Sequence, residues 1–166
     1  MHIKIYKNYL IYNKYKVKCV VGKRGIGTKK REGDLITPKG EYKIKLILYR
    51  KDRIKNIRTK LKKIAIKKNM GWCDDPASKK YNKLIKLPFS FNHEKLFKKN
   101  NSYDVVLVLD YNMRPIRKNK GSAIFIHIAK RNYKKTLGCI ALSKTSILKI
   151  VNTIKKNTVV KISAQI

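Results

Sequence analysis

Acidic residues are scarce in this chain. Nine Asp and Glu residues stand against 43 Lys and Arg residues, which gives a formal net charge of +34. Such a charge attracts polyanions, whether nucleic acid, anionic lipid or an anionic cell-wall polymer. Only eight of the basic residues are Arg, and the lysines are scattered along the chain among many Ile, Asn and Tyr residues. An A/T-rich coding sequence would give the same composition, whereas a dedicated nucleic-acid module would collect its basic residues on one element.

Cysteine and histidine are also rare, with three residues of each. The odd number of cysteines and the lack of a Cys-x-x-Cys pair argue against a disulfide framework and predict at least one free thiol. No two of these residues have the separation that is usual for a pair of zinc ligands. The sequence therefore predicts no metal site, and it implies no organic cofactor.

Long apolar runs are missing. No stretch of about 18 consecutive apolar residues occurs, so no transmembrane helix is expected. The first residues, MHIKIYKNYLIYNKYKVKCVVG, alternate Ile and Tyr with Lys and contain neither a continuous apolar segment nor a small-residue cleavage site. We expect this start to form strands rather than a secretory signal.

Several segments alternate β-branched or aromatic residues with polar ones, a pattern that is typical of strands. The hydrophobic content of 43% excludes wholesale disorder. The strands that we predict are 2–7, 9–13, 15–21, 41–50, 103–111, 123–129 and 158–166. Residues 51–102 have no clear period and are expected to form an ordered insertion.

One helix is predicted over about 144–155. Ser143 is placed as its N-cap, and Ile147, Val151 and Ile154 fall on one side of it. The expected fold class is α+β and β-rich, with a curled mixed sheet or sandwich and this one main helix packed on it. No linker or repeat divides the chain, so residues 1–166 are expected to form a single domain.

The segment FIHIAKRNYKKTLGCIAL, residues 125–142, holds the two residues with the clearest chemical meaning. His127 lies near the end of a predicted strand, and the excursion after it can return Cys139 to that end. An imidazole within about 3 to 4 Å would take the thiol proton and make the sulfur nucleophilic. Gly138 allows a tight turn, and the N–H groups of Gly138 and Cys139 are candidate oxyanion donors. The spacing alone is more typical of a small buried thiol and a core histidine.

The scarce acids and the single Trp mark a second candidate region. Asp74 and Asp75 follow Trp72 and Cys73 in the chain. In the functional interpretation they form a groove wall that binds the amines and amides of a peptide. In the alternative they cap turns and pair with lysines while Trp72 fills the core. A neighbouring carboxylate would raise the pKa of the Cys73 thiol, which argues against it as a nucleophile, and His93 is a weaker candidate base.

The segments IFIHIA and TLGCIAL together resemble the catalytic motif of the L,D-transpeptidases (the YkuD-like family), in which a His precedes a Ser/Thr-x-Gly-Cys segment. Other segments resemble a compact, stand-alone branch of that family and occur in the expected order: GIGTKKREGDLITPKGEYKI, GWCDDP, YNKLIKLP, HEKLF, YDVVLVLDYN and GSAIFIHIA. The similarity covers roughly residues 15–162.

The resemblance implies a β-rich catalytic domain that transfers acyl groups through a cysteine. Cys139 would attack the L,D bond between a diamino acid and D-Ala in a peptidoglycan stem peptide. D-Ala would leave, and the side-chain amine of a second stem would capture the acyl group. His127 would serve as the base for the thiol and then as the acid for the leaving amine. Gly138 and Cys139 would supply the oxyanion donors, and Thr136 would orient His127.

The chain departs from the family pattern at three positions. Leu137 and Ala141 stand where many members carry His and Arg, and Ile128 follows His127 where other members have Gly. The missing Arg is the residue to which substrate-carboxylate recognition is attributed.

Lys130, Arg131 and Lys135 are the candidates to take over carboxylate recognition. Trp72, Asp74 and Asp75 remain the other candidate substrate-binding residues.

Three functions follow from these observations. The leading hypothesis is an L,D-transpeptidase that acts on peptidoglycan stem peptides, with anionic cell-wall polymers as a further partner class and a monomeric state. The second is an L,D-carboxypeptidase or endopeptidase, which passes the same acyl group to water. The third is a polyanion-binding protein without catalysis, although no specific nucleic-acid motif is present. The resemblance implies the cell envelope or periplasm, yet no export signal is visible.

Overall fold

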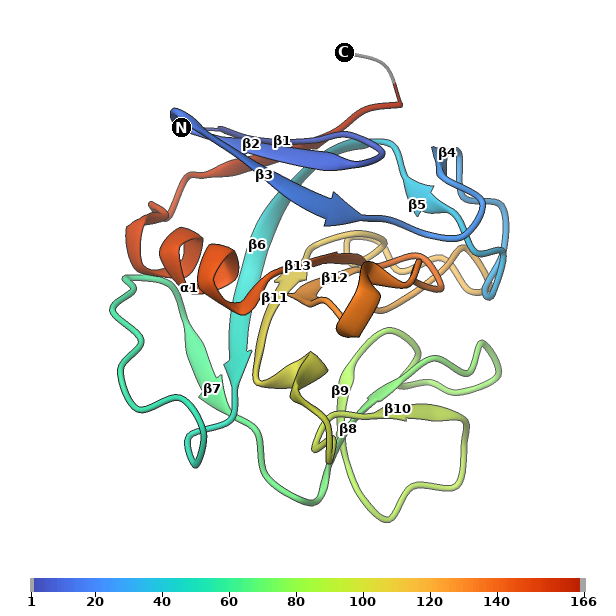
Figure 1. The fold of residues 1–166 in the computed structure, drawn as a ribbon. Coiled ribbons are helices and arrows are strands. Elements are labelled where there is room, and N and C mark those ends of the chain that lie inside the picture. Colours follow the sequence, from blue (N-terminus) through green and yellow to red (C-terminus); the bar gives the residue numbers. More distant parts are fainter. Residues whose placement is uncertain (1, 165–166) are drawn as a thin grey trace.

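The computed structural model describes residues 2–164 and is dominated by one large, curved sheet (Figure 1). Its nine strands lie in the order β11-β12-β13-β3-β2-β1-β14-β6-β7, and a further pairing of β11 with β6 closes the sheet into a barrel. The strand bounds are β1 His2–Ile5, β2 Tyr9–Tyr12, β3 Tyr15–Val20, β6 Gly40–Tyr49, β7 Lys63–Ala65, β11 Val105–Leu109, β12 Phe125–Ile128, β13 Ile140–Leu142 and β14 Val159–Ile162.

Two smaller sheets and three helical segments complete the structure. A three-stranded sheet has the order β10-β8-β9, and β4 pairs with β5. Their bounds are β8 Met70–Cys73, β9 Leu84–Lys86, β10 His93–Lys95, β4 Ile26–Gly27 and β5 Thr37–Pro38. The helical segments are α1 Lys144–Thr153 and the short 3-10 turns η1 Asn101–Tyr103 and η2 Arg131–Tyr133.

The predicted class and the predicted curled mixed sheet are confirmed, whereas the sandwich alternative is wrong. The sheet is mixed and accompanied by one α-helix, but it closes as a barrel rather than stacking as a sandwich. Helix α1 begins at Lys144, as predicted, and Ser143 caps it by accepting a hydrogen bond from the Ser146 N–H at 3.1 Å. The last predicted strand, 158–166, contains β14, and positions 165–166 lie outside the described residues.

The barrel strands β11 and β12 are buried on both faces, because one hydrophobic core lies on each side of them. On β11, Val105, Leu107 and Leu109 belong to the larger core, which also contains the buried face of α1. Val106 and Val108 point the other way, into a second core. This double burial explains why β11 is a continuous apolar run instead of an alternating one.

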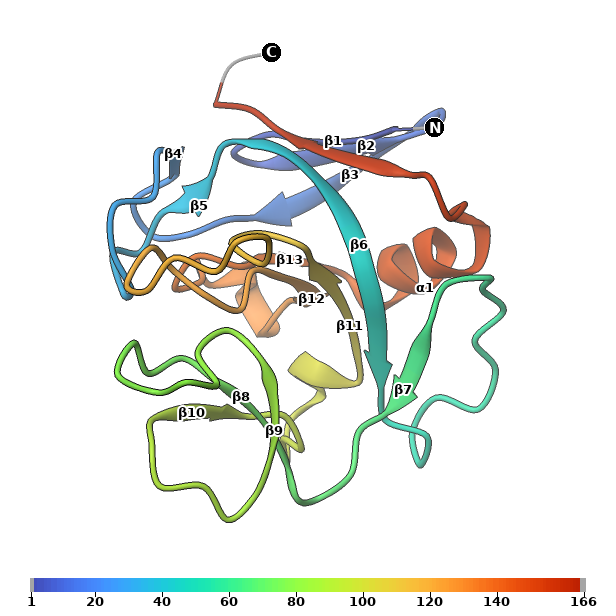
Figure 2. The same cartoon turned by 180° about the vertical axis from the view of Figure 1, so that it is seen from behind.

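The second core lies between the barrel and the small sheet β8–β10, which belongs to the segment predicted as an insertion at 51–102. Figures 1 and 2 show this sheet below β11 and β12. Trp72 of β8 packs edge to face on Phe125 of β12, with ring centroids 5.4 Å apart. The small sheet therefore covers the outer face of the barrel near His127. That this segment is an insertion into the domain stays a prediction.

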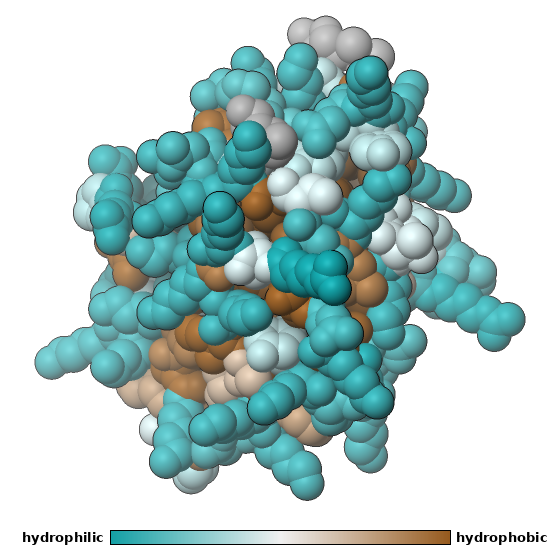
Figure 3. Space-filling model, turned by 90° about the vertical axis from the view of Figure 1, so that its left-hand side faces the viewer, coloured by the Kyte–Doolittle hydropathy of each residue, from teal (hydrophilic) through white to brown (hydrophobic). Residues whose placement is uncertain are grey.

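The surface agrees with the scattered distribution of lysine in the sequence. On the face drawn in Figure 3, hydrophilic side chains spread over the whole surface, and apolar atoms show between them in a limited area. No helix within residues 2–164 is long and apolar enough to cross a membrane.

Candidate active site

Strand register places His127 and Cys139 on the same side of the barrel wall. β12 and β13 are parallel, and His127 lies opposite Ala141. Cys139 precedes Ala141 by two residues and therefore points to the same face. That face carries the second core, against which Cys139 packs, whereas Ile126 and Ile140 point into the larger core. The alternation of the two strands thus brings together the two residues that the sequence singled out.

The Cys139 thiol is embedded in backbone groups of the neighbouring strand. Its Sγ donates to the Ala123 carbonyl at 3.1 Å and accepts from the Phe125 N–H at 3.4 Å. Burial raises the pKa of Cys139 from its ordinary value of 9.0 to about 12, although the Phe125 N–H works in the opposite direction. The Cys139 thiol is therefore neutral at rest, and it would have to lose its proton to react as a nucleophile.

The His127 imidazole is buried and held in one tautomer. Its exposed fraction is 8%, and its Nδ1 lies 2.9 Å from the carbonyl oxygen of Ile128. A carbonyl only accepts, so Nδ1 carries the proton and Nε2 presents a lone pair. Burial lowers the pKa of His127, which keeps the ring neutral and basic at neutral pH. Within residues 2–164 the imidazole makes no hydrogen bond to the Cys139 thiol, so the pair rests as two neutral groups.

Tyr103 fixes the imidazole from the side. Its ring packs edge to face on His127 with centroids 5.4 Å apart, and it also packs on Phe125. Burial raises the pKa of Tyr103, and the nearby Cys139 and Glu94 raise it further, so its hydroxyl stays protonated. Tyr103 was not singled out in the sequence, where it is one of ten tyrosines.

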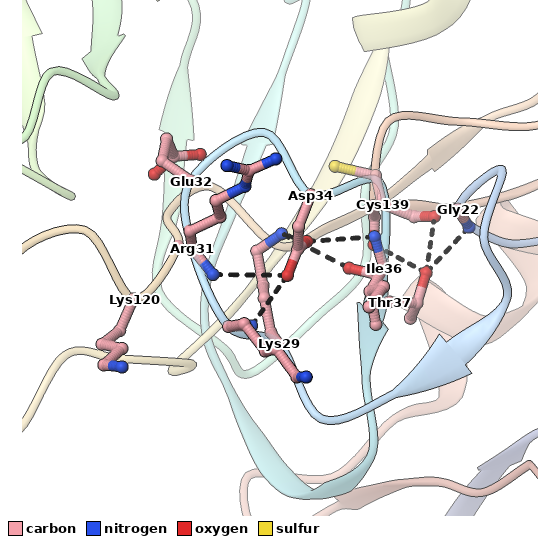
Figure 4. Close-up of polar contacts among 12 residues, drawn as sticks. Gly22, Lys29, Arg31, Glu32, Asp34, Ile36, Thr37, Lys120 and Cys139 are labelled. Atoms are coloured by element: carbon pink, nitrogen blue, oxygen red, sulfur yellow. Dashed lines mark hydrogen bonds and ion pairs between the residues drawn. The ribbon is translucent and has the colours of Figure 1, made fainter.

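Two threonines hold the turn that carries Cys139, and Figure 4 shows one of them, Thr37. Thr37 Oγ1 donates to the Gly138 carbonyl at 2.7 Å and accepts from the Gly22 N–H at 2.9 Å. Thr136 Oγ1 donates to the Cys139 carbonyl at 2.5 Å and accepts from the Gly138 N–H at 3.2 Å. Thr136 thus braces the turn, and among the described residues it has no bond to His127, which is the partner that the resemblance implied.

Gly138 is required by its backbone conformation. Its φ of +143° belongs to the region that favours glycine, and an added Cβ would lie 3.1 Å from the Ile36 carbonyl oxygen. Thr136 already receives the Gly138 N–H, whereas the Cys139 N–H, like that of Leu137, has no hydrogen-bond partner in the described part of the chain. Of the two oxyanion donors predicted, Cys139 is therefore the available one.

The small sheet supplies an acidic wall facing this site. Glu94 lies opposite Trp72 in the β8–β10 register, so both side chains share the face that packs on the barrel. Asp74 follows Trp72 by two residues, and its buried Oδ1 has no hydrogen-bond partner among the described residues. Burial raises the pKa of Asp74, and the charges of Glu32 and Glu94 raise it further. Three of the nine acidic residues of the chain therefore act on one small region.

The other predicted substrate residues occupy different environments. Trp72 is 3% exposed and its Nε1 donates to Asn82 Oδ1 at 3.0 Å, so it is a core residue that packs behind the acidic residues. Asp75 accepts from the backbone N–H groups of Ala77 and Asn92 at 2.9 and 3.1 Å, which is the loop-capping alternative.

The predicted cationic residues lie on the surface of the excursion between His127 and Cys139. Lys130, Arg131 and Lys135 are all exposed. Their side chains make no described contact with the thiol, and carboxylate binding by them stays a prediction.

Cys73 and His93 form a rival pair that the structure turns away from this site. The two residues lie opposite each other between β8 and β10, on the face of the small sheet away from Trp72. Cys73 is fully buried, and His93 Nδ1 lies 2.8 Å from the Phe91 carbonyl oxygen. Cys139 is partly exposed whereas Cys73 is not, so Cys139 is the better-presented thiol.

The described residues contain no group of three or more His, Cys, Asp or Glu side chains arranged to hold a metal ion. In a comparison with protein families, residues 3–162 match the family described as the L,D-transpeptidase catalytic domain, YkuD. A search of curated proteins gives no match.

Proposed function

This chain belongs to the L,D-transpeptidase catalytic domain family, and we propose from that premise that it cleaves and transfers peptidoglycan stem peptides through a thioester on Cys139. The observation that carries the proposal is the placement of a neutral thiol and a tautomer-fixed imidazole on one face of two adjacent parallel strands. Family-level catalysis follows from the match over residues 3–162, and the particular bond and acceptor are the proposed part.

The proposed reaction begins with proton transfer. His127 Nε2 takes the thiol proton as Sγ attacks the carbonyl of the L,D bond, so charge develops on the carbonyl oxygen only during attack. The Cys139 N–H donates to that oxygen, and the carbonyl of Ile128 steadies the imidazolium through Nδ1. The imidazolium then gives its proton to the departing amine of D-Ala, which leaves a thioester on Cys139.

The second half of the proposed reaction reverses these transfers. The side-chain amine of a second stem attacks the thioester, His127 accepts a proton from that amine, and the thiol is restored with the proton. Water in place of the amine would give the carboxypeptidase outcome. Both outcomes use the same residues, so the acceptor must be determined by experiment.

The acidic wall suits a donor peptide with a free ammonium group. Asp74 has an unpartnered buried oxygen, and Glu94 lies on the same face of the small sheet. A diamino acid brings one positive charge on its side chain close to the scissile bond. We infer that Asp74 receives this ammonium, while the exposed Lys130 and Arg131 receive the terminal carboxylate.

The proposal places the substrate, and therefore the site of action, in the cell envelope. A monomer and an affinity for anionic cell-wall polymers are further parts of it that rest on the sequence and its charge.

The experiment that tests the function is incubation with a defined stem tetrapeptide, with and without an amine acceptor, followed by mass spectrometry. We expect loss of D-Ala in both reactions and a cross-linked dimer in the second. Tripeptide without dimer in either reaction would replace the transferase by a carboxypeptidase. Intact tetrapeptide in both reactions, from protein with a folded circular dichroism spectrum, would contradict acyl transfer on this substrate.

Substitution of Asp74→Asn should weaken donor binding selectively. We expect KM for the tetrapeptide to rise about three- to tenfold, because a change of about 0.7 to 1.4 kcal/mol is the scale of one charge-assisted contact at a partly exposed site. The value of kcat should change by less than about twofold. The matched control is Glu41→Gln, which removes an exposed carboxylate paired with Lys161 elsewhere on the barrel. Equal effects of the two variants would show that net charge, not a contact, sets KM.

A further inference from the structure

A buried ammonium group lies directly behind the nucleophile turn. The side chain of Lys29 is 3% exposed, and among the described residues Lys29 is the only lysine in the buried class. Its Nζ donates to Asp34 Oδ1 at 2.6 Å and to the Ile36 carbonyl at 3.4 Å (Figure 4). A charged side chain is rarely buried in this way without a specific reason, because desolvation opposes it.

Two glycines lie against this side chain, and one of them makes room for it. A Cβ on Gly121 would lie 2.2 Å from Lys29 Cε, so any larger residue would collide with the lysine stem. A Cβ on Gly138 would lie 3.7 Å from Lys29 Nζ, so the ammonium is in contact range of the residue that precedes the nucleophile. The loop that carries Lys29 therefore packs against the turn that carries Cys139, with the Lys29 ammonium group between them.

Asp34 keeps that charge in place. Its carboxylate accepts from the N–H groups of Lys30 and Ile36 at 2.8 and 3.1 Å, in addition to Lys29. Although burial opposes ionisation, these hydrogen bonds lower the pKa of Asp34 to about 2. The Asp34 carboxylate therefore stays ionised across the working pH range, and its hydrogen bond to Lys29 Nζ holds the ammonium group beside the Cys139 turn.

Two carboxylates, Glu94 and Glu32, act on the Cys139 thiol, and Glu94 is itself ion-paired with Lys98. Glu94 and Glu32 both raise the pKa of Cys139, and Lys29 is the cation that lowers it. Ala141 supplies no charge where a cation after the nucleophile would help. A single fixed positive charge at the turn offsets the acidic wall at the moment when the sulfur and the carbonyl oxygen become negative.

We propose that Lys29, held by Asp34, is a positioning residue that stabilises negative charge on Cys139 Sγ and on the oxygen of the tetrahedral intermediate. This role rests on Cys139 being the nucleophile of the proposed function, but it does not depend on the identity of the peptide or of the acceptor. It is therefore measurable without substrate turnover.

The test is the second-order rate of iodoacetamide alkylation of Cys139 from pH 7 to 9, quantified by peptide mass spectrometry. In the neutral double variant Lys29→Met/Asp34→Asn, we expect the rate to fall about three- to tenfold at every pH, since the thiolate fraction follows the thiol pKa. In Asp34→Asn, where the cation remains, the rate should equal or exceed that of the unchanged protein. Glu32, Glu94, Tyr103 and His127, the other titratable groups around the thiol, are unaltered in both variants.

The matched control is Lys120→Met, which removes an exposed lysine from a neighbouring loop (Figure 4) and should leave the rate within about 1.5-fold. A similar fall in Asp34→Asn and in the double variant would assign the pair a merely structural role and overturn the proposal. If the double variant does not fold, a lower rate in Asp34→Asn overturns it and an equal or higher rate supports it. An inactive tetrapeptide assay with the expected alkylation rates would reject the proposed substrate and leave this inference standing.

Discussion

Replacement of Cys139 by alanine should reduce turnover of the stem tetrapeptide about 10⁴-fold or more, to below detection. The expected loss is this large because no other group in the site can form the covalent intermediate, and the remaining backbone donor and binding contacts accelerate only slow attack by water. The fold should survive, since the thiol contributes only two sulfur hydrogen bonds, to Ala123 and Phe125. Steady-state assays and thermal melting of the same preparation measure the two expectations.

Cys73→Ala is the matched control for this variant. Cys73 is fully buried and pairs with His93 across β8 and β10. It is therefore the other cysteine that has a histidine beside it. We expect Cys73→Ala to keep activity within about twofold while losing some stability through the small cavity. Activity that persists in Cys139→Ala and disappears in Cys73→Ala would move the chemistry to the other face of the small sheet.

The sequence predicted those features that depend on local pattern. The buried strand predicted over 123–129 contains β12, whose Phe125 lies in the second core while Ile126 and Ile128 lie in the larger core. Helix α1 and its Ser143 cap follow from a local signal as well. The glycine before Cys139 also predicted a tight turn, and the structure has a positive φ at Gly138 in that turn.

Features that depend on distant segments were beyond such patterns. Closure of the barrel joins β11 to β6, and no residue in either strand specifies its partner rather than another apolar strand. Lys29 is indistinguishable by type from the many other lysines, and only folding brings it behind Gly138. In the sequence, His93 is a candidate base and Glu94 is only its neighbour. The alternation of β10 nevertheless directs Glu94, and not His93, to the candidate site. Scarcity of acids was the signal that could have found it.

The pH dependence of the reaction is the second prediction with a large effect, and it distinguishes two kinds of cysteine–histidine pair. Burial lowers the pKa of His127 below its ordinary 6.5 and raises that of Cys139 to about 12, so both groups are neutral between these values. Attack requires the neutral imidazole, which is lost as pH falls through its pKa. We therefore expect kcat/KM to be level at neutral pH and to fall about tenfold per pH unit on an acid limb with a midpoint below 6.5.

The same reasoning predicts no alkaline limb from Cys139 below about pH 12, since the thiol remains protonated until attack. His127→Gln should lose about 10³-fold or more in kcat/KM and should also lose the acid limb, while Asp74→Asn should retain it, because the limb belongs to the imidazole and not to the acidic wall. Thiolate absorbance in the ultraviolet gives an independent reading, and it should be absent from Cys139 at pH 7. A thiolate signal at neutral pH that vanishes in His127→Gln would instead establish a preformed imidazolium–thiolate pair, and the proton transfer assigned to the attack step would then be wrong.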